Sequence, residues 1–388
     1  MTYNPNILRD VLRARSLSRN KLSERLGIDR DDLDAELERD PEPRQGILND
    51  IAKELALPSF VFYMEHSPQL HDVLPDFRAP TPAPSAKSRQ TIEAIQFAEG
   101  IQKAAIEGQA VGAPNLPRFT ATTTQGIDDF ALEARNFFSI TLQDQASAKD
   151  AREFYILCRK KIEDKGVFVL HDSFPHEDGS GFCLAHKRYP VIVVNTKQQT
   201  RGRRLFTLIH ELAHVLMQQS GISDPFVRNN DVERRCNRFA GAFLVPASYV
   251  TSLIGTIPTK DPDYDDVRWA SRRLKISQEA TVLRLEQLRV YNQGSHDKWK
   301  RIVHNMGNPD FSEKGGGGTE PPPQEKVKLA KYGFRFARTF DELLSTGLIT
   351  EINLYRATGL KPKYQRPYFD YTKSLTAGDL STLDVDDE

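Results

Sequence analysis

The sequence predicts an α+β fold that combines a small β-sheet with packed helices, and three observations support this prediction. Strand-like runs rich in β-branched and aromatic residues occur at 167–171, 181–186 and 191–195. A strongly apolar segment, residues 203–219, has helical periodicity and contains the run HELAH. A second amphipathic segment, residues 232–246, follows after a short loop. Helices followed by a small sheet and then by two packed helices indicate an α+β domain.

Length and composition limit the classes of protein to consider. The chain has 388 residues, of which 39% are apolar, so two or three domains with ordinary cores are expected. Lysine plus arginine and aspartate plus glutamate both total 53, so overall charge favours neither nucleic acid nor a membrane. The three cysteines, Cys158, Cys183 and Cys236, are too few for a disulfide framework and are expected in the core. With no apolar run near membrane length and a polar N-terminus, we expect a cytoplasmic protein with no membrane segment.

Residues 1–66 predict a small helical module. The run LSRNKLSERLGIDRDDLDAEL resembles the helix-turn-helix of Xre-type repressors, with Ser18 capping a helix and Gly27 in the turn. The helix that would enter the major groove lies in residues 29–42, which carry eight carboxylates and two arginines. Because phosphate contacts need positive charge, this composition disfavours direct DNA binding. A packing role or a protein-binding role is the favoured interpretation.

A proline-rich linker is predicted at residues 67–87. Helical periodicity then resumes at 88–107, 130–138 and 147–165 before the three strand-like runs begin.

The sheet is expected to offer an edge to an extended peptide, which gains main-chain hydrogen bonds there. The candidate edge strand is formed by Gly181, Phe182, Cys183 and Leu184. Three side chains are candidates for stabilising a transition state, although a single histidine more often has a structural role: His171, His186 and Tyr249. The sequence does not single out one of them.

The run HELAH predicts a catalytic zinc site. His210 and His214 are four residues apart, so both imidazoles lie on one helix face and can bind one metal ion. Glu211 is turned by about 100° from His210 and is placed to act as general base. A third ligand is still needed, and Glu233 near the start of the next helix is the best candidate, giving one zinc per chain. Alternative carboxylates are Asp224 and Asp231. Two interpretations compete with a catalytic site: a chance occurrence of the pattern and a purely structural metal. If the site is catalytic, we expect a domain of the zincin type.

The remaining chain is divided by composition. The catalytic domain is predicted at 88–304, including a basic helical subdomain at 264–304 that is either a solvated face or a surface for nucleic acid or an acidic partner. A Gly- and Pro-rich linker at 305–325 precedes a C-terminal helical unit at 326–370 and an acidic tail at 371–388.

The runs GFCLAHKRYPVIVVN, RLFTLIHELAHVLM and ERRCNRFAGAFLVP together resemble the ImmA/IrrE family of bacterial zinc metallopeptidases. One departure is Cys236, which stands where the family pattern has alanine. The resemblance implies His210, His214 and Glu233 as zinc ligands and Glu211 as general base. It also implies a site-specific endopeptidase that cleaves a helix-turn-helix repressor or antitoxin-like partner in a mobile-element, stress-response or defence system. The run LPDFR at 74–78 resembles a segment of related chains, and its attachment to the catalytic domain is a further expectation.

Two other hypotheses remain at this point. The chain could be a transcription regulator or sensor that combines an Xre-like DNA-binding domain with a non-catalytic metallopeptidase fold, although the acidic helix argues against DNA binding. It could also be a toxin-like or defence effector with a broader substrate range, because the catalytic residues alone do not define the substrate.

Overall fold

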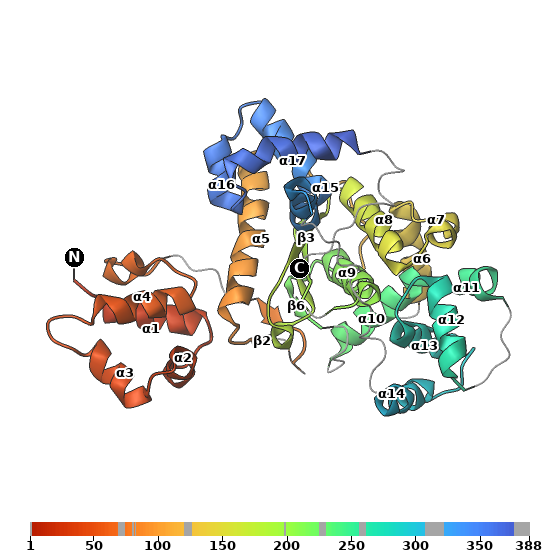
Figure 1. Cartoon of the computed structure of the whole chain (residues 1–388), viewed down its shortest axis with the longest axis horizontal. Helices are drawn as coiled ribbons and strands as arrows, with labels where there is room; N and C mark the ends of the chain where they lie inside the picture. The colour runs from red at the N-terminus through yellow and green to blue at the C-terminus, as the bar shows by residue number, and fades with distance from the viewer. Residues whose placement is uncertain are drawn as a thin grey trace.

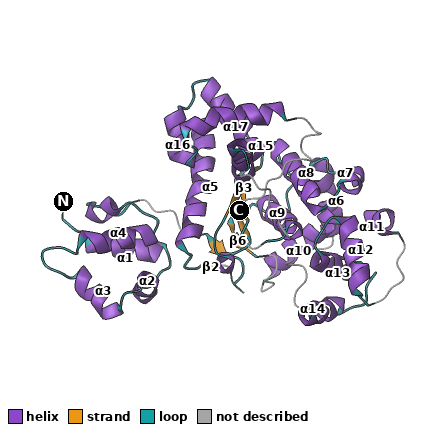
Figure 2. Cartoon of the chain, viewed as in Figure 1, coloured by secondary structure: helices purple, strands orange, loops and turns teal. Residues whose placement is uncertain are grey.

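The structure is a computed structural model in which a small central sheet is surrounded by helices, with a separate helical unit at the N-terminal end (Figures 1 and 2). It describes residues 2–68, 74–79, 81, 83–119, 126–197, 199–224, 230–255, 261–306 and 322–375. Most of the predicted linker at 305–325 and the tail from residue 376 onward lie outside the described residues.

The N-terminal unit contains four helices and a 3-10 helix: α1 (Pro5–Ala14), α2 (Arg19–Leu26), α3 (Arg30–Leu37), α4 (Gln45–Glu54) and η1 (Ser59–Tyr63). Ser18 caps α2 by accepting a hydrogen bond from the Lys21 amide, and Gly27 ends the helix in the left-handed conformation. Both features match the sequence prediction. The unit has an apolar core of its own, which includes Leu8, Leu33 and Phe62. The assignment as a DNA-binding or partner-binding module remains a prediction.

Local arginines neutralise part of the acidic α3. Asp34 forms ion pairs with Arg19 at 3.0 Å and with Arg30 at 2.6 Å, and Glu36 pairs with Arg44 at 2.8 Å. These exposed or half-exposed pairs contribute little to stability, but they lower the net charge that α3 presents to a partner.

The central sheet contains six strands: β1 (Pro75–Asp76), β2 (Ala83–Pro84), β3 (Phe168–Asp172), β4 (Gly181–Leu184), β5 (Val191–Asn195) and β6 (Gly221–Ser223). Their order is β2-β1-β6-β4-β5-β3. β3 is parallel to β5 and β1 is parallel to β6, whereas β4 is antiparallel to both of its neighbours. The three strands predicted from the sequence are therefore β3, β5 and β4.

Two features of the sheet differ from expectation. Residues 181–184, expected as an edge strand, lie inside the described sheet because β6 pairs with them on the side opposite β5. The three-residue β6 is too short to leave a periodic pattern in the sequence. The proline-rich linker also contributes β1 and β2, since proline is tolerated where a strand begins or lies at an edge.

The other helices pack around this sheet. They are α5 (Arg89–Glu107), α6 (Ile127–Phe137), α7 (Leu142–Ser147), α8 (Ala151–Asp164), α9 (Arg201–Leu216), α10 (Asp231–Leu244), α11 (Ala247–Ile254), α12 (Tyr264–Leu274), α13 (Gln278–Gln287), α14 (Ser295–Asn305), α15 (Gln324–Ser345), α16 (Glu351–Thr358) and α17 (Pro362–Ser374). The C-terminal helices share one apolar core with the sheet, and α15 packs directly against β3 and α8. α17 extends into the segment expected to be a tail. Among the described helices, none is both long enough and apolar enough to cross a membrane.

The basic subdomain corresponds to α12, α13 and α14. One of its arginines is structural: Arg284 is almost fully buried and donates to the Val245 carbonyl at 2.8 Å. In Figure 1 these helices and the acidic α3 lie at opposite ends of the molecule. The opposite charges of the two regions therefore do not meet in this conformation.

A buried polar junction joins α8, β3 and α15. Glu163 on α8 is fully buried and accepts a hydrogen bond from the Phe334 amide at 3.0 Å, while Arg159 lies 3.8 Å from the same carboxylate oxygen. α15 is kinked at Gly333, where φ is 79°, and a Cβ at this position would collide with the Glu163 carboxylate. Burial raises the pKa of Glu163 to about 7, against the opposing influence of Arg159.

This junction predicts that stability falls as pH rises through neutrality. Between its ordinary pKa of 4.5 and its folded value of about 7, Glu163 keeps a proton in the folded chain that the unfolded chain has released. The free energy of unfolding should therefore decrease between pH 5 and pH 8, with a contribution from Glu163 of roughly 2–3 kcal/mol. Glu163→Gln, which mimics the protonated carboxyl group, should remove this contribution in chemical unfolding experiments at the two pH values. Glu133→Gln, at an exposed position on α6, serves as the control and should keep the wild-type pH dependence. Equal pH dependence in all three proteins would contradict the prediction.

Candidate metal centre

The centre is built on α9, the helix that carries the run HELAH. Thr200 caps its first turn by accepting a hydrogen bond from the Arg203 amide, and its last three turns are buried. β5 and β4 pack against one side of α9, and α10 and α8 also contact it. His210, Glu211 and His214 are therefore polar groups in an apolar environment, where each needs a polar partner or a bound ion.

The structure brings His210, His214 and Glu233 together from α9 and α10. The Nε2 atoms of the two histidines are 3.2 Å apart. Glu233 Oε1 lies 3.1 Å from His214 Nε2, and Glu233 Oε2 lies 3.2 Å from His210 Nε2. All three side chains are fully buried, and the imidazoles hold the pKa of Glu233 below its usual value although burial opposes this.

Residues on α10 support this arrangement. Asn230 caps α10 and accepts a hydrogen bond from the Glu233 amide at 2.9 Å. Asn237 Oδ1 lies 3.0 Å from His210 Nδ1, so that an N–H at Nδ1 donates to the amide oxygen and leaves the Nε2 lone pair free for a metal. Asn237 was not predicted from the sequence. Its position four residues after Glu233, on the same helix face, is a signal that could have identified it.

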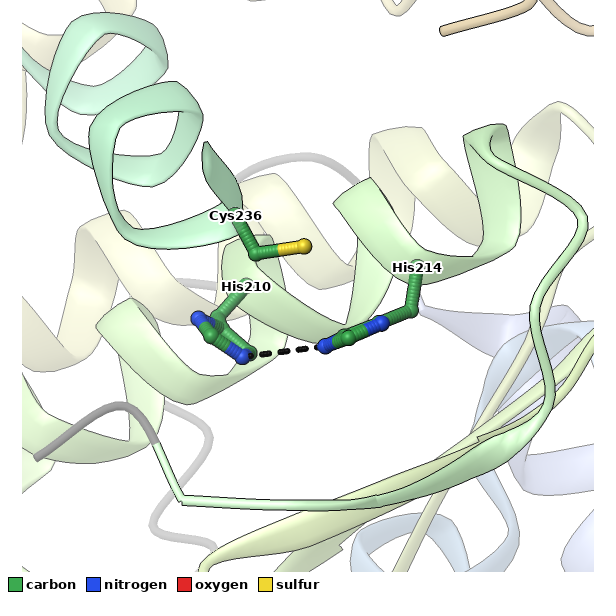
Figure 3. A group of neighbouring side chains, drawn as sticks. All are labelled: His210, His214 and Cys236. Atoms are coloured by element: carbon green, nitrogen blue, oxygen red, sulfur yellow. Dashed lines mark hydrogen bonds between the residues drawn. The ribbon is translucent and has the colours of Figure 1, made fainter. Parts of the chain in front are cut away.

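Cys236 also belongs to this cluster (Figure 3). It is buried, and the donor atoms of His210, His214 and Cys236 all lie within 4.8 Å of one another. Burial raises the pKa of its thiol well above the ordinary value, so the uncomplexed side chain is a neutral thiol. Cys236 is buried, as expected for a core cysteine, but its position beside the two histidines was not predicted.

The donors fit a zinc ion. Neutral imidazole nitrogen, carboxylate oxygen and cysteine sulfur are the ligands that zinc takes in proteins. Glu233 Oε2 is buried without a hydrogen-bond partner among the described residues, and burying such an atom is costly unless an ion or another polar group satisfies it. A bound cation would satisfy it. The close approach of Glu233 to both imidazoles favours His210, His214 and Glu233 as the ligand set, with Cys236 as an alternative donor.

Glu211 does not face these three donors but contacts the sheet. Its Oε1 accepts a hydrogen bond from the Ser223 hydroxyl on β6, and its Oε2 is buried without a hydrogen-bond partner among the described residues. Gly181 makes room for this carboxylate, because a Cβ there would lie 3.0 Å from Oε1. Burial raises the pKa of Glu211 to about 8, against the opposing influence of His210. Ser223 was not predicted, since nothing in the sequence indicated that β6 would bring its hydroxyl to Glu211.

The three candidate transition-state donors have partners outside this cluster. His171 lies on β3, two strands away from β4, and its ring contacts the Tyr155 hydroxyl. His186 accepts hydrogen bonds at Nδ1 from the amides of Arg188 and Tyr189. The ring of Tyr249 on α11 lies under the Arg135 guanidinium, 4.9 Å away. The alternative ligands Asp224 and Asp231 are placed differently from Glu233: Asp224 accepts from the Ser180 hydroxyl, and Asp231 pairs with Arg234.

One unpredicted aromatic side chain completes the surroundings. Phe77 stacks on the ring of His214, with centroids 4.6 Å apart and an interplanar angle of 16°. It belongs to the LPDFR run, whose expected attachment to the domain that carries the HELAH helix is present in the structure.

Comparison with known proteins gives a family match for part of the chain. Residues 162–286 match the family model Peptidase_M78, described as an IrrE N-terminal-like domain. This region runs from the end of α8 to α13 and includes His210, Glu211, His214 and Glu233. It supports the resemblance to the ImmA/IrrE family and a metallopeptidase-like function. Neither a curated protein nor a solved structure matches the chain.

Proposed function

We propose that this chain is a zinc-dependent, site-specific endopeptidase whose substrate is a helix-turn-helix repressor or antitoxin-like protein. The observation that carries the proposal is the convergence of two imidazole nitrogens and a carboxylate, each about 3 Å from the next, within the region that matches a peptidase family. A buried carboxylate with a raised pKa lies directly after the first histidine. This combination of ligands and base is the one that zinc-dependent hydrolysis requires.

In this proposal His210, His214 and Glu233 hold the zinc, and hydrogen bonds support two of these residues. Asn237 fixes the ring orientation of His210, and Asn230 fixes the first turn of the helix that carries Glu233. When bound, zinc would polarise the scissile carbonyl and lower the pKa of a coordinated water. Glu211 then acts as general base and afterwards gives its proton to the departing amine. The Ser223 hydroxyl engages one carboxylate oxygen of Glu211 and leaves the other free to take the proton.

The proposed substrate class rests on the N-terminal unit. A module with its own core, joined to the catalytic part through the proline-rich linker, is suited to recognise a partner that the catalytic cleft then cuts. Residues 29–42 contain eight carboxylates, of which Asp34 and Glu36 form ion pairs with arginines and six others contribute negative charge. Such an acidic surface complements the basic DNA-reading helix of a repressor.

The substrate proposal predicts selective proteolysis. The zinc-loaded full chain should cut a helix-turn-helix repressor, tested first with any encoded beside its gene, at one or a few discrete positions resolved by mass spectrometry. Casein should remain nearly intact, because a cleft that requires an extended, remotely held segment rejects most sequences. A zinc chelator should stop the reaction and added zinc should restore it. Rapid casein digestion would favour the broad-range effector instead, and the absence of cleavage in every repressor tested would count against a repressor-specific peptidase.

A further inference from the structure

Residues 74–79 lie across the candidate metal centre as an additional strand. β1 pairs in parallel with β6, with Asp76 opposite Ile222, and the Phe77 amide donates to the Ile222 carbonyl at 2.9 Å. β6 is the strand whose Ser223 contacts Glu211. The segment therefore lies between β2 and β6 and occupies the side of β6 that faces away from β4, where an extended peptide could pair with β6.

The side chain of Phe77 fills a space shaped for a ring. One face of the ring stacks on His214. On the other strand, a Cβ at Gly221 would collide with the ring, so that glycine at this position is what admits it. Phe77 is only 5% exposed, yet it belongs to neither of the two apolar core clusters formed by the described residues. Its burial thus comes from the metal centre and not from the general core.

Directional polar contacts hold the segment in place. The Asp76 carboxylate accepts hydrogen bonds from Arg78, Lys87 and the Ser85 hydroxyl. Arg78 also donates to the Glu177 carbonyl on η3 (His176–Asp178). The Asn230 side-chain amide, from the residue that caps the Glu233 helix, donates to the carbonyls of Phe77 and Ala79.

With this segment in place, no peptide can reach the centre. His210, Glu211, His214 and Glu233 all have zero exposure. A substrate must therefore displace a nearby part of the chain. Residues 74–79 are the best candidate, because another extended peptide can reproduce their pairing with β6 and their few polar contacts.

We propose that the outer edge of β6, the ring face of His214 and the space over Gly221 form a binding subsite for an extended peptide carrying an aromatic side chain. Residues 74–79 fill this subsite in cis. The inference rests on the proposed peptidase function, and it specifies that function further: the preferred substrate presents an aromatic residue next to the metal. Because residues 74–79 belong to the same chain, their effective concentration at the subsite is on the order of millimolar, and they outcompete free peptides that bind weakly.

Peptide binding tests the subsite without requiring hydrolysis. The probes are a fluorescein-labelled hexapeptide LPDFRA, which copies residues 74–79, and its counterpart LPDARA. The protein is the zinc-loaded full chain carrying Glu211→Gln, so that no peptide is cut. In fluorescence polarisation, adding Phe77→Ala should increase the affinity for LPDFRA at least tenfold and leave the affinity for LPDARA nearly unchanged. Phe340→Ala, which removes a buried ring from α15, is the control and should change neither affinity.

A second variant keeps the aromatic residue in place. Arg78→Ala removes the contacts to Asp76 and to Glu177 while leaving Phe77 intact, and it should raise the affinity for LPDFRA in the same direction. Equal affinity for LPDFRA with and without these substitutions would overturn the inference, as would an equal gain for both probes. The outcome is separate from the peptidase proposal. If the probe binds as expected but the chain with an intact Glu211 cuts no protein, the subsite stands and the peptidase proposal is rejected. If that chain cuts protein but the substitutions leave probe binding unchanged, the peptidase proposal stands and the subsite is rejected.

Discussion

Replacing Glu211 by glutamine is expected to lower the rate of peptide hydrolysis by about 10²–10⁴-fold, the usual contribution of a general base. The amide is close in size and keeps a hydrogen-bonding group beside the Ser223 hydroxyl, but it cannot accept the proton. Because Glu211 faces β6 and not the cluster of donors, zinc content should remain at one ion per chain. Initial rates on a cleaved repressor, together with metal analysis of the purified variant, measure both quantities.

Ser223→Ala provides the matched comparison for this experiment. It removes the hydroxyl that orients Glu211 but leaves the carboxylate in place, so its loss of rate should be well below that of Glu211→Gln. If Glu211→Gln retained wild-type activity, the general base would have to be another group. If it lost its zinc, the carboxylate would be acting as a ligand.

The second large effect concerns metal retention. Glu233→Ala should weaken zinc binding by more than about 100-fold, beyond the 10–100-fold that loss of a supporting hydrogen bond costs. The reason is that its carboxylate oxygens lie 3.1 and 3.2 Å from the two histidine nitrogens and supply the only negative charge among these three donors. Competition with a chromogenic zinc chelator measures the affinity, and Asn237→Ala, which leaves all three donors in place, serves as the control.

Cys236 makes the same experiment decisive about the ligand set. With Glu233 as the third ligand, Cys236→Ala should weaken zinc binding by less than about 100-fold, since its loss then costs no more than the loss of a supporting contact. A loss as large as that of Glu233→Ala would identify the thiolate as a ligand. Full retention of zinc by Glu233→Ala would transfer the role to another donor, such as Cys236, Asp224 or Asp231. Substitution with cobalt distinguishes these outcomes, because a thiolate ligand adds a charge-transfer band that a carboxylate does not.

If the strap formed by residues 74–79 occupies the metal centre in the resting protein, recognition of a partner and access of its peptide to the centre are physically linked. The strap lies in the segment between the N-terminal unit and α5, and it reaches the metal centre through Phe77. A partner that binds the N-terminal unit is thereby positioned close to the segment that must leave. This arrangement would restrict proteolysis to proteins that offer both a docking surface and an aromatic-bearing extended stretch.

Much of the catalytic region could be predicted from local patterns. The helical period of residues 203–219 and the spacing of His210 and His214 gave α9, and the apolar runs before it gave β3, β4 and β5. The cap at Ser18 was identified from residue type and is present in the structure. The joining of His210, His214 and Glu233 was predicted on the same basis, because each residue has a defined face on a helix whose packing is dictated by its apolar stripe.

Interactions between distant segments could not be predicted in this way. Local patterns predicted the two helices that carry the donor residues, three strands and the chemistry of the donor set, because helical period, strand alternation and side-chain type are all local properties. The folded chain, in contrast, shows that β6 pairs with β4, that Ser223 on β6 contacts Glu211 and that Phe77, beside β6, stacks on His214. These contacts depend on main-chain pairing along sheet edges, where the hydrogen-bonding groups are the same for nearly every residue and therefore leave no pattern in the sequence.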